Sequence, residues 1–136
     1  MRYIFREIVD LAEFERRPHR KGNTHMQFLL LIYEAEERFA TGYHSEEFAE
    51  YGAFGQKYSG SIKNGNALQP TPSAKTVRVR NGGSKTSDGP FAETKEQLGG
   101  YYLIEAPSID EAAKMAAEIP GARYGCIEVR PIMVFS

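Results

Sequence analysis

The segment that most constrains the fold is the apolar run at residues 26–33, MQFLLLIY. Successive side chains of a β-strand point to opposite faces of the sheet, and from Phe28 to Tyr33 both sets are apolar. The run is far shorter than the ~20 residues that span a bilayer, so it predicts a strand buried on both faces. A chain with this strand must place a cover over each face of its sheet.

Two later segments show the spacing of amphipathic helices. In residues 45–63 the apolar side chains recur at three- and four-residue steps, and Ser45 can cap the first turn. The second helix is predicted to begin after Ser108, because Glu111 three residues later completes a capping box, and to end at Pro120. Each helix has one apolar side, so each is expected to lie against one face of the sheet.

Short apolar stretches predict three further strands, at residues 67–68, 100–106 and 127–132. A hairpin is inserted between the first two of these. Asn81 and Gly82 form its turn, and its arms are residues 76–80 and 84–87. A helical turn is expected at residues 93–98, between the hairpin and the next strand.

The predicted order is strand, helix, strand with an inserted hairpin, strand, helix, strand. This order is typical of an α+β fold of the ferredoxin-like, split βαβ type. Two helices can cover only one face of a four-stranded antiparallel sheet. Because the first strand is apolar on both faces, we expect another copy of the chain to cover the second face, in a homodimer.

Composition argues against several classes of protein. Lys and Arg number 17 against 18 Asp and Glu, a balance that argues against a nucleic-acid-binding protein. The single Cys126 excludes an internal disulfide and a cysteine-rich zinc site, and it is expected to be buried. No histidine pattern has metal-ligand spacing, so no metal or other cofactor is expected. Without a bilayer-length apolar run or a signal-peptide core, a cytoplasmic protein with no membrane partner is expected.

Residues 1–25 differ in composition from the rest of the chain. They are rich in charge, and their apolar residues between positions 4 and 12 fall at helical spacing. The segment could form one amphipathic helix that ends before Pro18, or it could be an extension ahead of a functional start at Met26. We therefore divide the chain into an N-terminal extension, residues 1–25, and one α+β domain, residues 26–136.

Asp88 is the candidate catalytic residue. It lies in a turn and is followed by Gly89 and Pro90, whose backbone would hold the carboxylate in a fixed direction. If partly buried, Asp88 could act as a general base. Alternatively, it accepts backbone N–H bonds in an Asx turn or caps the following helical turn.

Four other side chains are candidates for ligand binding. Arg78 and Arg130 each carry a planar guanidinium suited to a carboxylate or phosphate, and Tyr33 and Tyr102 could line an aromatic pocket. Each also has a structural interpretation. Arg78 could belong to a solvated hairpin face, Arg130 could form an ion pair between two copies with Glu128, and the tyrosines could be core residues.

The segment at residues 86–104, TSDGPFAETKEQLGGYYLI, closely resembles the YCII-related family in its DGPF-motif branch. The segments ALQP, TVRVR and IEVRPI, at residues 67–70, 76–80 and 127–132, resemble the same family in the same order. The resemblance covers roughly residues 26–133 and implies a dimeric α+β barrel of ferredoxin-like subunits. Some relatives resemble small hydrolytic or dehalogenating lyase enzymes with a His–Asp pair in a cleft beside the dimer. Members of this branch are often associated with sigma factors, which implies a regulatory alternative.

The sequence departs from the enzyme-like relatives at two positions. They carry a histidine in the first helix, where this chain has none between Ser45 and Lys63 and has His44 just before it. Asn66 stands where an acidic residue is expected after the glycine. Two hypotheses follow: a small dimeric enzyme that uses Asp88 on a small polar or aromatic molecule, and a non-catalytic ligand-binding or regulatory module with the same cleft.

Overall fold

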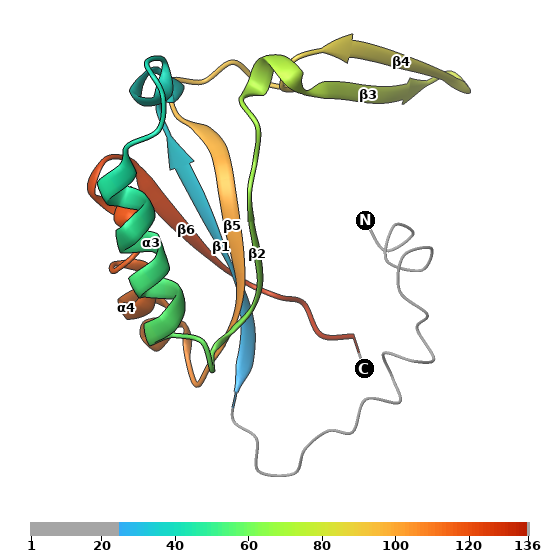
Figure 1. The fold of residues 1–136 in the computed structure, drawn as a ribbon. Helices are drawn as coiled ribbons and strands as arrows, with labels where there is room; N and C mark the ends of the chain where they lie inside the picture. Colours follow the sequence, from blue (N-terminus) through green and yellow to red (C-terminus); the bar gives the residue numbers. More distant parts are fainter. Residues whose placement is uncertain (1–24, 136) are drawn as a thin grey trace.

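The computed structural model describes residues 25–135, which form a four-stranded antiparallel sheet in the order β2-β5-β1-β6, two helices and a separate hairpin (Figure 1). The strands of the sheet are β1 (Met26–Glu34), β2 (Ile62–Ala67), β5 (Gln97–Ala106) and β6 (Cys126–Pro131). The helices are α3 (Ser45–Lys57) and α4 (Ile109–Ala116), with short 3-10 turns η1 (Glu36–Phe39), η2 (Thr71–Ser73) and η3 (Pro120–Arg123). The α+β, ferredoxin-like fold class predicted from the sequence is confirmed.

The core lies between the sheet and the two helices. From Phe28 to Glu34, every second residue of β1 faces the helices and is buried, and Phe28 and Leu30 are fully enclosed. Small residues of α4, Ala112 and Ala116, are also buried, so this helix lies close to the strands. One half of the predicted capping box is present, since Oγ of Ser108 accepts a hydrogen bond from the backbone N–H of Glu111 at 3.2 Å, while the Glu111 carboxylate pairs with Lys114.

The opposite face of the sheet carries the other half of the β1 side chains. Leu29 pairs with Leu103, and Leu31 pairs with Tyr101, and all four are half-buried. Figure 1 shows both helices on the other side of the sheet. The expectation that the helices cover only one face is therefore confirmed, and the homodimer stays a prediction.

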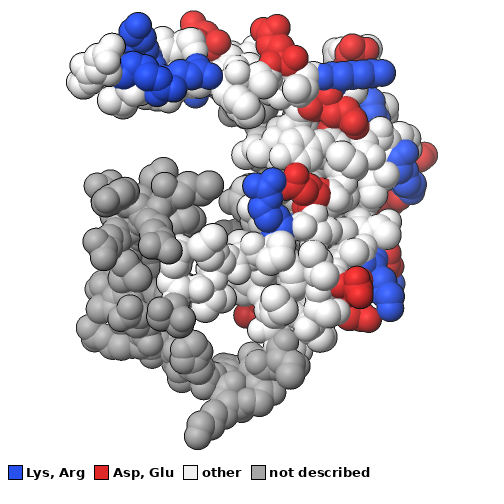
Figure 2. Space-filling view, turned by 180° about the vertical axis from the view of Figure 1, so that it is seen from behind, with Lys and Arg blue, Asp and Glu red and all other residues white. Residues whose placement is uncertain are grey.

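Strands β3 (Lys75–Arg80) and β4 (Gly83–Asp88) form the inserted hairpin, which reaches away from the helices (Figure 1). Its turn has positive φ at Asn81 and Gly82, 53° and 76°, as the sequence predicted. Figure 2 shows its Lys and Arg side chains standing clear of the body. The two valines of β3, Val77 and Val79, are 61% and 62% exposed.

Several sequence-based predictions are wrong in detail. The helix expected at residues 45–63 is shorter, since α3 ends at Lys57, and the strand expected at residues 67–68 is longer, since β2 begins at Ile62. The prediction failed because an apolar residue at position 62 fits a helical step and a core-facing strand position equally well. Residues 93–96 are not helical, and Gln97 begins β5. Cys126 is exposed, because it begins β6 opposite Tyr33 on the face that the helices leave uncovered.

Two further observations bear on the sequence analysis. The expected extension, apart from its last residue, and its helix before Pro18 lie outside the described residues. Among the described residues, no helix is long and apolar enough to cross a membrane.

Candidate functional site

A cavity of about 670 Å³ lies at the end of the sheet where β1 ends and β5 begins. We call it the end cavity. Its walls come from β1, η1, the first turns of α3, β2 with the loop after it, and the start of β5. Six aromatic side chains line it: Phe39, Tyr43, Phe48, Tyr51, Tyr101 and Tyr102. Small-molecule sites are typically ~300–1,000 Å³ and mostly apolar, so the end cavity has the size and the lining of such a site.

Two glycines let β2 and β5 approach closely in the wall of this cavity. A Cβ atom on Gly65 would lie 2.6 Å from Cδ1 of Tyr102, and one on Gly100 would lie 3.1 Å from the backbone oxygen of Asn66. The ring of Tyr102 also packs against Phe54 of α3, with centroids 5.2 Å apart. A side chain at position 65 would displace this ring, so the glycine there helps to place Tyr102 in the wall.

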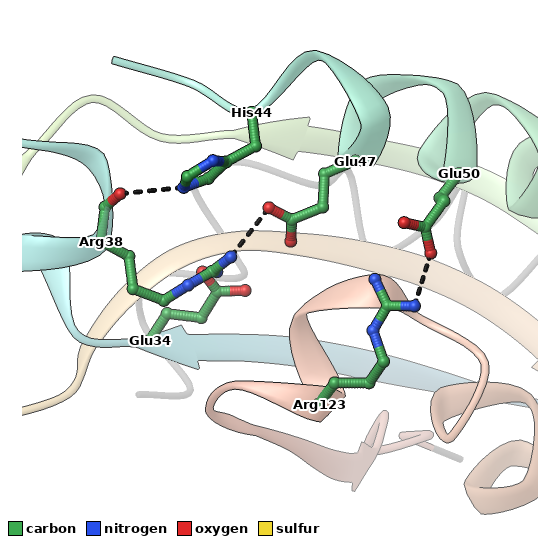
Figure 3. Close-up of polar contacts among 6 residues, drawn as sticks. All are labelled: Glu34, Arg38, His44, Glu47, Glu50 and Arg123. Carbon is green, nitrogen blue, oxygen red and sulfur yellow. Dashed lines mark hydrogen bonds and ion pairs between the residues drawn. The ribbon is translucent and has the colours of Figure 1, made fainter. Parts of the chain in front are cut away.

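Arg38 lies between the carboxylates of two buried residues, Glu34 and Glu47 (Figure 3). Its Nη1 donates to Oε2 of Glu34 at 2.8 Å, and its Nη2 donates to Oε2 of Glu47 at 2.9 Å. The two glutamates are 6% and 8% exposed, and both line the cavity. The Arg38 guanidinium also lies over the ring of Tyr124, with Cζ 3.6 Å from the ring centroid. The cluster therefore connects β1, η1 and α3.

Burial changes the acid–base properties of two groups in the cavity. Burial raises the pKa of Glu34 above its ordinary value of 4.5, while Arg38 opposes the rise and the charge of Glu47 adds to it. Burial, together with the charge of Glu34, raises the pKa of Tyr51 to about 12. Tyr51 is therefore a hydrogen-bond donor at neutral pH, and Glu34 takes up a proton more readily than an exposed glutamate does.

His44 lies at the N-terminal end of α3 and lines the same cavity. Its Nε2 is 3.1 Å from the backbone oxygen of Arg38. The predicted cap at Ser45 is wrong, because the helix begins one residue earlier, with His44 as its N-cap and no capping bond from that side chain. Within residues 25–135, no group of three or more His, Cys, Asp or Glu side chains is arranged to hold a metal ion.

Asp88 lines a second hollow, of about 500 Å³, which also contains Glu93 and Lys95. Its Oδ1 accepts a hydrogen bond from Nζ of Lys75 at 2.7 Å, and its side chain is 84% exposed. Glu36 and Gln97 line both hollows, so the two are neighbours. Asp88 therefore lies beside the end cavity, in a more open position, with titratable groups around it.

Comparison with known proteins identifies the family. Residues 26–136 match the family model of the YCII-related domain. The chain belongs to the YCII-related family. A protein of Rhizobium meliloti (strain 1021) is 37% identical over 118 residues, which cover 81% of this chain and 94% of that protein, and it is itself described as uncharacterized. The expected family is thus confirmed, and the relative brings no activity with it.

The four ligand-binding residues that the sequence of this YCII-related chain suggested do not lie together in the structure. Tyr102 lines the end cavity. Tyr33 alternates with buried Ile32 and Glu34 along β1 and so lies on the uncovered face of the sheet. Arg130 lies on that face too, where Nη2 pairs with Oε2 of Glu128 in the same chain, and the ion pair expected between two copies stays a prediction. Arg78 is exposed on the hairpin, opposite Lys85.

Sequence reasoning missed the Glu34–Arg38–Glu47 cluster. A signal was present in β1, because Glu34 continues the inward-facing series of Phe28, Leu30 and Ile32 and so places a carboxylate at a core position. A second signal was in α3, where Glu47 lies one turn before Tyr51 on the side of the helix that carries the apolar residues. Polar residues in phase with an apolar series are the feature to look for in a related sequence.

Proposed function

We propose that this YCII-related protein binds a small molecule with an apolar or aromatic body in the end cavity, as a small enzyme or enzyme-like protein. The observation that carries the proposal is a cavity of about 670 Å³ with aromatic walls and buried charged groups at one side. Perturbed titratable groups in a concave apolar site are typical of functional sites. The DGPF motif at residues 88–91 supports placing the chain in that branch of the family.

The proposed chemistry is proton transfer. Glu34 is the best-placed acid or base in the cavity, because its raised pKa brings proton exchange closer to neutral pH. Asp88 stays our proposed catalytic residue for the adjoining hollow, where a part of the ligand that extends past Glu36 and Gln97 would meet it.

Thermal-shift screening of a metabolite library tests ligand binding. A ligand stabilises the folded chain in proportion to ln(1 + [L]/Kd), so a binder raises Tm. We expect hits on the unaltered chain that weaken in Phe48→Ala, because Phe48 lines the cavity and is 60% exposed, so its loss leaves the fold intact. Phe91→Ala is the matched control, since Phe91 is 82% exposed and lines neither hollow. Equal shifts in both variants would place the ligand elsewhere.

A non-catalytic binding or regulatory module is the second candidate. One observation favours it: the Asp88 carboxylate is exposed and paired with Lys75 rather than enclosed. Asp88→Asn distinguishes the two. If a hit from the screen is converted to product and Asp88→Asn stops the conversion, the enzyme with Asp88 as its base is supported. A hit that binds unchanged, with no conversion by either chain, favours the module.

We propose a homodimer as the working form. The uncovered sheet face carries half-buried Leu29, Leu31 and Leu103, and the hairpin projects on that side with Val77 and Val79 exposed. An isolated two-stranded hairpin is marginally stable in water, so a second copy that packs under it and over the sheet would stabilise both.

Sedimentation tests the dimer directly. We expect a dimer at micromolar concentration and a monomer for Leu31→Glu, which places a charge in the middle of the uncovered face. Glu118→Gln is the control, because Glu118 pairs with Lys57 of α3 on the helix side. A monomeric full-length chain would contradict the proposal, and a chain lacking residues 1–24 that then dimerises would show that the chain's own N-terminal segment covers the face.

A further inference from the structure

The side chains of Asp, Glu, Lys and Arg type that line the end cavity are all acidic. Three carboxylates line it, those of Glu34, Glu36 and Glu47, and no Lys or Arg is among the described residues that line it. Glu36 is already satisfied, because its oxygens accept from the backbone N–H and the hydroxyl of Thr71, at 2.7 and 2.8 Å. Both donors are neutral, so Glu36 keeps its negative charge, and the carboxylates of Glu34 and Glu47 add to it.

These two glutamates share one cation. Arg38 donates to Oε2 of each, and within the described chain no other residue donates to either carboxylate. A buried carboxylate without its own positive partner is costly, and the raised pKa of Glu34 is a consequence of that burial and of the nearby charge of Glu47. An additional cation at this side of the cavity would restore the balance.

The aromatic walls also favour a cation over an anion. Tyr43 packs between Phe39 and Phe48 with its ring tilted against both, the ring centroids being 5.5 and 5.7 Å away, and the faces of such rings attract ammonium groups. The N-terminus of α3 attracts anions in general, but here Glu46 and Glu47 already place negative charge in its first turn. An anionic ligand would therefore meet carboxylates rather than free helix amides.

We infer that the ligand of the end cavity is an amine, with one ammonium group on an aromatic or apolar body. The inference rests on the proposed function, since it names the class of molecule that the cavity takes. The ammonium would donate to Glu34 and Glu47 on the cavity side of Arg38, and the body would lie among the aromatic rings.

Three probes that differ mainly in head group test this inference on the full chain: 2-phenylethylamine, 2-phenylethanol and 3-phenylpropionate. Calorimetry measures the affinities, and backbone amide NMR locates the binding through shifts at Gly65 and Gly100, in the cavity wall. We expect the amine to bind about tenfold more tightly than the alcohol, because hydrogen bonds to a charged group are stronger by ~1.4 kcal/mol, and the propionate to bind most weakly.

The outcomes separate the two proposals. If the alcohol or the propionate binds in the cavity as tightly as the amine, the amine inference fails and the proposed small-molecule site survives. If none of the three causes shifts at the cavity at millimolar concentration, both proposals fail.

Two isosteric variants then identify the groups responsible. Glu34→Gln and Glu47→Gln each remove one negative charge from the pair around Arg38. We expect the amine to lose most of its advantage over the alcohol in both, while the affinity for the alcohol changes little. Glu118→Gln, on the surface at Lys57, is the control and should leave all affinities unchanged. An undiminished preference for the amine in both variants would overturn the assignment, and if either variant does not fold, the comparison of probes on the unaltered chain still decides it.

Discussion

The chain holds two carboxylate sites side by side that differ in how far water reaches them. In the end cavity, Glu34 and Glu47 are buried around Arg38. In the adjoining hollow, Asp88 pairs with Lys75 and both side chains are mostly exposed, at 84% and 68%. A buried ion depends on its partner, whereas an exposed pair is screened by water and contributes little. Charge removal should therefore affect stability strongly at the first site and weakly at the second.

The largest expected effect follows from removing the shared cation. Arg38→Met keeps a long side chain but leaves two buried carboxylates without a donor, which we expect to cost about 3 kcal/mol of unfolding free energy. Urea unfolding at pH 7 measures the loss. A change below ~0.5 kcal/mol, typical of surface positions, would show that water reaches this cluster as freely as it reaches Asp88.

A smaller effect is expected from crowding the same cluster. A Cβ on Gly121 would lie 3.0 Å from the Tyr51 hydroxyl and 3.1 Å from Cγ2 of Ile32, and closer still to Oε1 of Glu34. Overpacking a filled site costs ~1–3 kcal/mol, so Gly121→Ala should destabilise the chain by about 1 kcal/mol or more. Gly52→Ala, in α3 with nothing within 4 Å of the new methyl, should instead stabilise it by about 1 kcal/mol. Equal effects on Tm would mean that the cluster is loosely packed.

The pH dependence should also differ between buried and exposed carboxylates. The pKa of Glu34 is raised by burial, so its contribution to stability is present below 4.5 and is lost as the pH rises through the higher value of the folded state. The pKa of Glu50 is lowered by Arg123, so its contribution is present at neutral pH and is lost on acidification. The Tm of the unaltered chain minus that of Glu34→Gln should therefore fall from pH 4 to pH 7, and the same difference for Glu50→Gln should rise. Parallel curves would contradict the assignment.

The smallest effect is expected at the exposed site. Lys75→Met removes the partner of Asp88, whose carboxylate then turns to water, and the unfolding free energy should change by no more than about 0.5 kcal/mol. A loss comparable to that of Arg38→Met would show that the hairpin is held to the body through this pair.

Local chemistry and the apolar pattern made most of the fold predictable. The helix N-cap at Ser108, the turn at Asn81 and Gly82, and the strand at residues 26–33 each follow from local chemistry or pattern, and the structure has all three. Ile62 does not, because one apolar residue fits either a helix or a strand until its neighbours are known.

The candidate site was less predictable for a related reason. Arg38 follows Glu34 by four residues and precedes Glu47 by nine, and the sequence does not show that both carboxylates are buried around the one guanidinium. Asp88 is found by its turn chemistry, whereas the Glu34 cluster depends on how β1, η1 and α3 pack.

The position of Asp88 at the base of the hairpin has a mechanical consequence. Lys75 and Asp88 are the first and last residues of the ribbon, and the nearby backbone bond from the Gly89 N–H to the Ala74 oxygen, 2.7 Å long, closes its base. The carboxylate is thus fixed to the ribbon rather than to the sheet. Asp88 stands where the ribbon joins the body, so the direction in which the ribbon leaves the sheet sets where this carboxylate points over the neighbouring hollow.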